Sequence, residues 1–204
     1  MFFRRSVSGL LLAVLVVLAG CGAFRTDYPA ALPAAVSKGW TVSTIDVIVP
    51  DTLTVSEAPV IAPEADIVWR EEPAGDRRAQ VARIFREGAE KATAALDGPR
   101  PVRLEITLVR FHALTLQAEA LPYNEGVHAI TFTARILDAR TGAELVPATR
   151  IDADMPAIMG SAARLARSVG LTQRVQIVRH LETVFAGWLG IGPDPRQSFT
   201  RIGV

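Results

Sequence analysis

The chain has 204 residues, of which 22 are Lys or Arg and 21 are Asp or Glu, so its formal net charge at pH 7 is +1. Basic and acidic residues are interspersed, whereas nucleic-acid-binding proteins usually gather basic residues on one face, so we do not expect a nucleic-acid ligand. The single cysteine leaves no intramolecular disulfide. The fold must therefore depend on a hydrophobic core, which a chain of this length can bury.

The first twenty residues have the pattern of a secretory signal peptide. Arg4 and Arg5 form a short basic region, and an uncharged apolar run follows from Leu10 to Ala19. This run is shorter than the roughly 20 apolar residues of a transmembrane helix. We expect residues 1–20 to be removed, which takes away two arginines and no acid and changes the net charge from +1 to −1.

The next feature is Leu18-Ala19-Gly20-Cys21, which resembles the lipobox of bacterial lipoproteins. In that family the cysteine thiol is acylated, the peptide is cleaved just before it, and the new amino terminus is acylated as well. Each buried methylene contributes about 0.8 kcal/mol, so several acyl chains hold a protein firmly on a bilayer. The resemblance implies that Cys21 is lipidated and that the domain faces the periplasm. An unmodified cysteine in an ordinary signal peptide is the alternative.

The resemblance also bears on which membrane is involved. Gly22 occupies the position at which an aspartate would favour retention in the inner membrane. We therefore expect a lipid-anchored, periplasm-facing protein of the cell envelope, at the outer membrane rather than the inner one.

The mature chain is expected to form one domain with a flexible segment on each side. Residues 21–38 contain Pro29 and Pro33 and show no clean hydrophobic period, which predicts a lipidated N-terminus and tether. The globular domain is expected over residues 39–192, and residues 193–204 are expected to be a C-terminal tail.

The first half of the domain predicts one strand and one helix. The β-branched run from Val42 to Val49, which ends at Pro50, indicates a strand. Between Gly75-Asp76 and Gly98-Pro99, apolar residues recur at spacings of three and four, which predicts an amphipathic helix.

The second half predicts three strands and a second helix. Apolar and polar residues alternate over 102–108, and the slip at Val109 indicates a bulge or a second covered face. Residues 130–136 alternate in the same way, and after a tight turn at 138–142 a third strand is expected over 144–154. A loop with some helix is expected over 155–170, followed by a helix capped by Thr172.

The order strand, helix, three strands, helix predicts an α/β fold. We expect a two-layer sandwich in which two helices pack on one face of a small mixed sheet, with the last three strands in an antiparallel meander. This order, the lipobox and the run from Ile136 to Leu145 resemble small uncharacterised Gram-negative envelope lipoproteins and, more distantly, ABC-type transport auxiliary lipoproteins. The second resemblance implies a non-catalytic subunit that docks on a transporter or bridges membranes.

No set of residues predicts a catalytic site, a metal site or a cofactor. His112 and His128 could approach each other on neighbouring strands, but His180 lies among polar positions of the last helix, so no third ligand is evident. Ser161 lacks the second glycine of a nucleophile elbow and is read as a loop or capping serine.

Two carboxylates lie close together near the end of the third predicted strand. Asp152 and Asp154 share one side of it and could work as a pair, but no partner acid or metal pattern surrounds them. We interpret them as a solvated strand end.

The polar loop Tyr123-Asn124-Glu125 is the candidate partner contact, because loops between rigid elements often carry binding residues. A plain hairpin connection is the alternative.

The leading hypothesis is a non-catalytic binding or scaffolding subunit of an envelope transport or assembly system, with a protein of the envelope as partner. The alternative is a carrier or enzyme that handles a small apolar ligand or lipid. A deep apolar pocket would favour the carrier, and a flat exposed patch or an unpaired strand edge would favour the scaffold.

Overall fold

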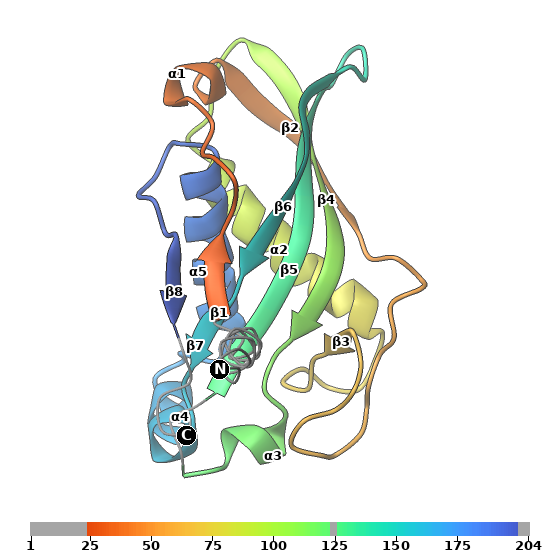
Figure 1. The fold of residues 1–204 in the computed structure, drawn as a ribbon, viewed down its shortest axis with the longest axis vertical. Coiled ribbons are helices and arrows are strands. Elements are labelled where there is room, and N and C mark those ends of the chain that lie inside the picture. The colour runs from red at the N-terminus through yellow and green to blue at the C-terminus, as the bar shows by residue number, and fades with distance from the viewer. Residues whose placement is uncertain (1–23, 123–125, 200–204) are drawn as a thin grey trace, which may run out of the picture.

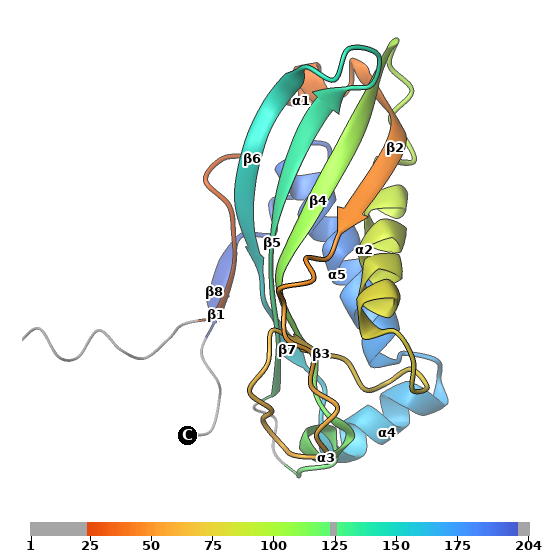
Figure 2. The same ribbon diagram turned by 90° about the vertical axis from the view of Figure 1, so that its right-hand side faces the viewer.

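Two long helices, α2 (Arg77–Thr93) and α5 (Gln173–Trp188), cover one face of a mixed β-sheet (Figures 1 and 2). The structure is a computed structural model and describes residues 24–122 and 126–199. The predicted two-layer α/β sandwich, with both helices on the same face, is confirmed. Among the described residues, no helix layer covers the opposite face of the sheet (Figure 2).

The sheet has eight strands within the described residues, where the sequence predicted four. In chain order they are β1 (Phe24–Asp27), β2 (Trp40–Ile48), β3 (Ile67–Val68), β4 (Arg100–His112), β5 (Gly126–Asp138), β6 (Glu144–Ala153), β7 (Met155–Ala157) and β8 (Gln197–Phe199). The main path across the sheet is β2-β4-β5-β6-β1-β8, while β3 pairs with β4 and β7 with β5. The four additional strands have two to four residues each, too few for a pattern of alternation to reveal them.

The predicted antiparallel meander is formed by β4, β5 and β6, while β2 runs parallel to β4. The slip of alternation at Val109 is a bulge, because the register with β5 shifts between Leu108 and Arg110. As a result, Leu108 and Phe111 both face the core. The bulge is thus confirmed, and it changes the face on which every later side chain of β4 lies.

The predicted turn and the predicted cap at Thr172 are also present, and Asp76 caps the other long helix. In the turn after β5, Asp138 Oδ1 accepts hydrogen bonds of 3.0 Å from the backbone N–H groups of Arg140 and Thr141. Asp76 caps α2 by accepting from the Ala79 N–H, and Thr172 caps α5 in the same way. These elements are determined by local hydrogen bonding, and local sequence therefore predicts them.

Aromatic side chains fill the space between the sheet and the helices. Phe132 of β5 lies 5.1 Å from Phe85 of α2 and 5.2 Å from Phe185 of α5, measured between ring centroids. The two helices approach closely at Gly88, where a Cβ atom would lie 2.8 Å from the Leu181 Cβ. Within the described residues the largest fully buried side chains include Trp69, Trp188, Phe85, Phe111, Phe132 and Phe185.

Three shorter helices complete the described part of the chain. They are α1 (Ala34–Ser37), α3 (Leu116–Glu119) and α4 (Gly160–Ser168). The segment 155–170, expected to be a loop with some helix, therefore contains β7 and a helix of nine residues. None of the helices within residues 24–122 and 126–199 has the length and apolar composition of a membrane-spanning segment.

The predicted tether at residues 21–38 is wrong for the part that the structure describes. Its strand β1 pairs with β6 and β8, and Tyr28 is only 2% exposed. The predicted tail is wrong for the same reason, because Gln197–Phe199 is β8. Both strands are short and bond to segments far away in the sequence, so no local period marks them.

Candidate functional site

The two sites predicted from sequence, Cys21 and the loop Tyr123-Asn124-Glu125, lie outside the described residues. The loop follows α3, which stands between the end of β4 and the start of β5. The connection between β4 and β5 therefore also contains a short helix.

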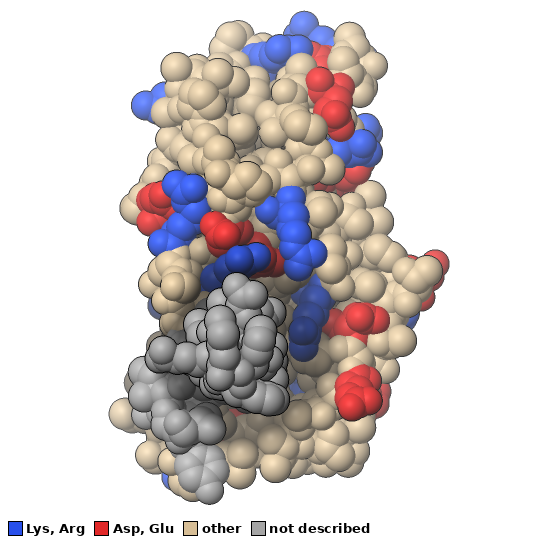
Figure 3. All heavy atoms as spheres, in the orientation of Figure 1, with Lys and Arg blue, Asp and Glu red and all other residues tan. Residues whose placement is uncertain are grey.

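A groove in two adjoining parts crosses the sheet face that the helices leave open, which is the face seen in Figure 3. The parts have volumes of about 270 and 330 Å³, and Phe24, Arg110 and Ala129 line both. We call the first the apolar half; its other lining residues are Ile61, Ala62, Pro63, Val68, His112, Ala113, Leu114 and Val127. We call the second the polar half; its other lining residues are Arg25, Thr131, Arg150, Asp152 and Asp154.

In the polar half, two carboxylates fasten β1 to the sheet. Asp152 Oδ2 accepts a 2.9 Å hydrogen bond from Arg25 Nη2, and its Oδ1 accepts one of 3.2 Å from the Thr131 hydroxyl. Asp154 accepts from the backbone N–H groups of Ile130 at 2.9 Å and of Arg25 at 3.2 Å. Burial raises the pKa of Asp154. The interpretation as a solvated strand end is wrong, because both carboxylates have protein partners.

The same half carries two further arginines, Arg110 and Arg150. Arg150 forms an ion pair of 3.1 Å with Asp152, whereas Arg110 forms no ion pair with any of the described residues. Arg110 Nη2 lies 3.3 Å from His112 Nδ1. The polar half therefore holds three arginines and two carboxylates, and the carboxylates are already hydrogen-bonded within the protein.

Sequence reasoning missed Arg25 and Arg110 as members of one site. In β4 the buried side chains up to the bulge are Val102, Leu104, Ile106 and Leu108, so strict alternation would also bury position 110. The bulge at Val109 reverses this and exposes Arg110 on the open face. The slip at Val109 was the signal in the sequence. No feature of the sequence indicated that Arg25 belongs to the site, because it lies in the segment expected to be a tether.

The histidines do not form the arrangement considered from sequence. His112 lines the groove on the open face, and its Nε2 contacts the backbone oxygen of Ala65. His128 lies on β5 with the parity of the core residues Ile130 and Phe132, so its side chain faces the helix layer. The two histidines are thus on opposite faces of the sheet.

On the side of the helix layer, His128 lies close enough to His180 of α5 for the two to interact electrostatically. His180 Nε2 lies 3.3 Å from the Thr26 hydroxyl, which itself donates to the backbone oxygen of Asp154 at 2.9 Å. Since the hydroxyl hydrogen is used there, we assign the imidazole N–H as the donor in the first contact. Neither ring nitrogen of His128 has a hydrogen-bond partner among the described residues.

Burial controls the ionisation of both histidines. It lowers the pKa of His128 to about 3, with a further contribution from His180, and lowers the pKa of His180 to about 4. Both imidazoles are therefore neutral at neutral pH. In residues 24–122 and 126–199, no group of three or more His, Cys, Asp or Glu side chains could hold a metal ion.

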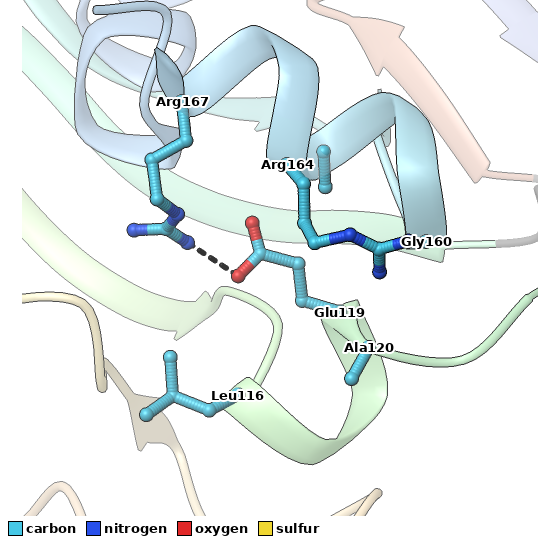
Figure 4. A pocket seen from close by; sticks show the side chains of 7 residues that line it. Leu116, Glu119, Ala120, Gly160, Arg164 and Arg167 are labelled. Carbon is cyan, nitrogen blue, oxygen red and sulfur yellow. Dashed lines mark hydrogen bonds and ion pairs between the residues drawn. The ribbon is translucent and has the colours of Figure 1, made fainter.

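A smaller hollow lies between α3 and α4 (Figure 4). Glu119 and Arg167 face each other across it and form an ion pair, and Arg167 also pairs with Glu71 at 3.1 Å. Ser161 is exposed in the first turn of α4, where Met159 occupies the N-cap position, so it is not a capping serine. These contacts hold the two short helices against the start of α5.

A family model matches residues 40–204, and it describes a family of unknown function (DUF6778). The chain belongs to this family. The matched region begins at the first residue of β2, and so it contains both long helices and every described strand except β1. No curated protein matches the chain.

Among the solved structures that are similar to the chain, three have sequence identities of 18% or less. A protein of Caulobacter crescentus CB15, described provisionally as a lipoprotein, is 18% identical, with 72% of this chain and 90% of that chain covered and a TM-score of 0.33. Two structures of the PelC dodecamer from Paraburkholderia phytofirmans are 10% and 11% identical. Their coverage is 78% and 79% of this chain and 95% and 97% of theirs, with TM-scores of 0.29 and 0.30.

Proposed function

We propose that this chain is a lipid-anchored, periplasm-facing lipoprotein that serves as a non-catalytic binding or scaffolding subunit of an envelope transport or assembly system. The observation that carries the proposal is the sequence Leu18-Ala19-Gly20-Cys21 at the end of an apolar signal segment. Acylation of Cys21 would hold the domain on a membrane without any contribution from its fold. Gly22 favours the outer membrane within this proposal.

An uncovered strand edge supports a scaffolding role. β2 is the first strand of the sheet path and pairs with β4 but with no other described strand. Ser43, Thr44 and Ile48 are exposed along it. An open edge presents backbone N–H and C=O groups to which an extended segment of another protein can add as a strand. An envelope protein, including a subunit of an ABC-type transporter, is the partner that we propose.

The alternative function, a carrier of a small apolar ligand, is favoured by a different observation. The apolar half of the groove is lined by Ile61, Pro63, Leu114 and Val127 and opens to the surface. The interior between sheet and helices is filled by the aromatic core, so a carried ligand would have to lie in this surface groove.

The anchor is tested by growing cells with a labelled fatty acid and recovering the protein. The native chain should incorporate the label, and the Cys21→Ser variant should not. A Ser37→Ala variant, altered in α1 and away from the lipobox, is the matched control and should incorporate as much label as the native chain. Label in Cys21→Ser would show that Cys21 is not the acylated residue.

The scaffolding role is tested with a photo-cross-linking residue placed at Thr44 on the β2 edge or at Glu90 on the exposed side of α2. In intact cells, position 44 should capture a specific envelope protein that position 90 and the Cys21→Ser background do not. Capture of lipid or small molecules alone, with no protein at position 44, would favour the carrier.

A further inference from the structure

The short distance between the anchor and the first strand limits where the membrane can lie. Three residue steps separate Cys21 from Phe24, and consecutive Cα atoms are about 3.8 Å apart, so the two Cα atoms are at most roughly 11 Å apart. Phe24 begins β1 and lines both halves of the groove. Acyl chains on Cys21 would therefore hold the open sheet face near the bilayer surface.

We propose that this face, with the groove at its centre, is the surface by which the domain lies on the bilayer that anchors it. The inference rests on the lipidation proposed above and assigns a membrane-contacting surface within the domain itself. We define this surface by Phe24, Val60, Ile61, Arg25, Arg110 and Arg150.

The apolar part of this surface suits the interfacial region of a bilayer. Val60 and Ile61 are 47% and 55% exposed and belong to the loop that forms one wall of the groove. Phe24 stacks on Phe199 of β8, with ring centroids 5.9 Å apart. Apolar side chains that are exposed next to an acyl anchor can enter the lipid without unfolding any element of the sheet.

The charged part of the surface suits anionic lipid headgroups. Arg110 forms no ion pair with a described residue, and the side chains of Arg25 and Arg150 remain more than half exposed although both reach Asp152. Arginine binds phosphate through several N–H donors, and basic residues near a membrane are attracted to anionic lipids. The apolar half and the polar half of the groove share Phe24 and Arg110. Apolar side chains therefore lie next to arginines on this surface, just as acyl chains lie next to charged headgroups in a bilayer.

The helix layer offers the matched control, because it lies on the opposite side of the sheet (Figure 2). Glu90 of α2 and Arg179 of α5 are exposed there. Since Cys21 is the only cysteine and its thiol is blocked once acylated, a cysteine introduced at position 61 or 90 can be spin-labelled selectively.

The test uses the full mature lipidated chain, reconstituted in vesicles of phosphatidylethanolamine and phosphatidylglycerol. Its acylation is checked by mass spectrometry and its attachment by flotation. For Ile61→Cys, we expect the spin label to become several-fold less accessible to a water-soluble nickel chelate and more accessible to oxygen than in detergent. For Glu90→Cys, neither accessibility should change. When Arg110→Gln is combined with Ile61→Cys, the label at position 61 should become more accessible to the nickel chelate. When Arg179→Gln is combined with Ile61→Cys, this accessibility should not change.

Two results would overturn the proposal in distinguishable ways. If the chain carries no acyl mass, both the lipidation and this surface are wrong. If the acylated chain floats with the vesicles but the label at position 61 stays as accessible to nickel as the label at position 90, the anchor is correct and the proposed surface is wrong.

Discussion

The carboxylate of Glu71 accepts a 2.6 Å hydrogen bond from the backbone N–H of Arg174 in the first turn of α5. A second bond, of 2.9 Å, comes from the N–H of Gln173. The first N–H groups of a helix have no partner within the helix, and its N-terminus carries partial positive charge. A carboxylate from the loop before α2 therefore stabilises a helix about a hundred residues later, together with the cap from Thr172.

Glu71→Gln should lower the free energy of unfolding by about 1–2 kcal/mol, because the amide loses the charge that interacts with the helix N-terminus and with Arg167. Urea denaturation of the two proteins measures this difference. The exposed Glu90→Gln should change stability by less than about 0.5 kcal/mol. Equal effects at positions 71 and 90 would contradict the role of Glu71 in capping α5.

The buried histidines should make the fold less stable in mild acid. Their folded pKa values, about 3 for His128 and about 4 for His180, lie below the unfolded value of 6.5. The unfolded state therefore binds protons first as the pH falls. The contribution of the two histidines to the free energy of unfolding is therefore at its maximum above pH 6.5. It decreases from there toward pH 4, by up to about 1.4 kcal/mol per pH unit for each histidine.

His128→Leu tests this directly. The leucine removes a buried side chain whose ring nitrogens have no partner among the described residues, so stability at pH 7 should be unchanged or higher. Denaturation series at several pH values between 6 and 4.5 measure the slope of the free energy of unfolding against pH. In the variant this slope should correspond to about one proton fewer taken up on unfolding. An unchanged slope would show that His128 does not titrate on unfolding.

Gly88→Ala should destabilise the protein by about 1–3 kcal/mol, because the added methyl group would overlap Leu181 and force α2 away from α5. Gly75→Ala is the control. Its nearest neighbour would be the flexible end of Gln80 at 3.4 Å, so little change is expected. Thermal unfolding of both variants checks the prediction, and a Gly88→Ala protein as stable as the native chain would be inconsistent with the close helix contact.

Tyr28→Ala should remove about 3–5 kcal/mol of stability, as expected for a large aromatic side chain in a core. Tyr28→Phe should have a smaller effect, of about 1 kcal/mol, through loss of the 3.2 Å hydrogen bond to Asp194. The exposed neighbour Pro29→Ala should be close to neutral. If Tyr28→Ala were also neutral in urea denaturation, residues 24–38 would behave as the tether that their composition suggested.

Local sequence was sufficient wherever a few neighbouring residues decide the structure. The helix caps at Asp76 and Thr172 and the turn at Asp138 depend on side chains that bond to backbone groups two or three residues away. The bulge at Val109 is a one-residue change in a period of two. Residues 18–21 are read as a linear motif, so the lipidation of Cys21 is a prediction from sequence alone.

Tertiary structure decided where distant segments meet. Phe24–Asp27 becomes a strand because β6 and β8 offer it hydrogen bonds, and its own four residues contain no period that would show this. The same packing places Arg25 beside Asp152 and puts His180 close enough to His128 to lower its pKa. Sequence alone thus determined the two long helices, the four longer strands and the expected anchor. The groove depends on contacts between residues more than a hundred positions apart, which composition and periodicity do not encode.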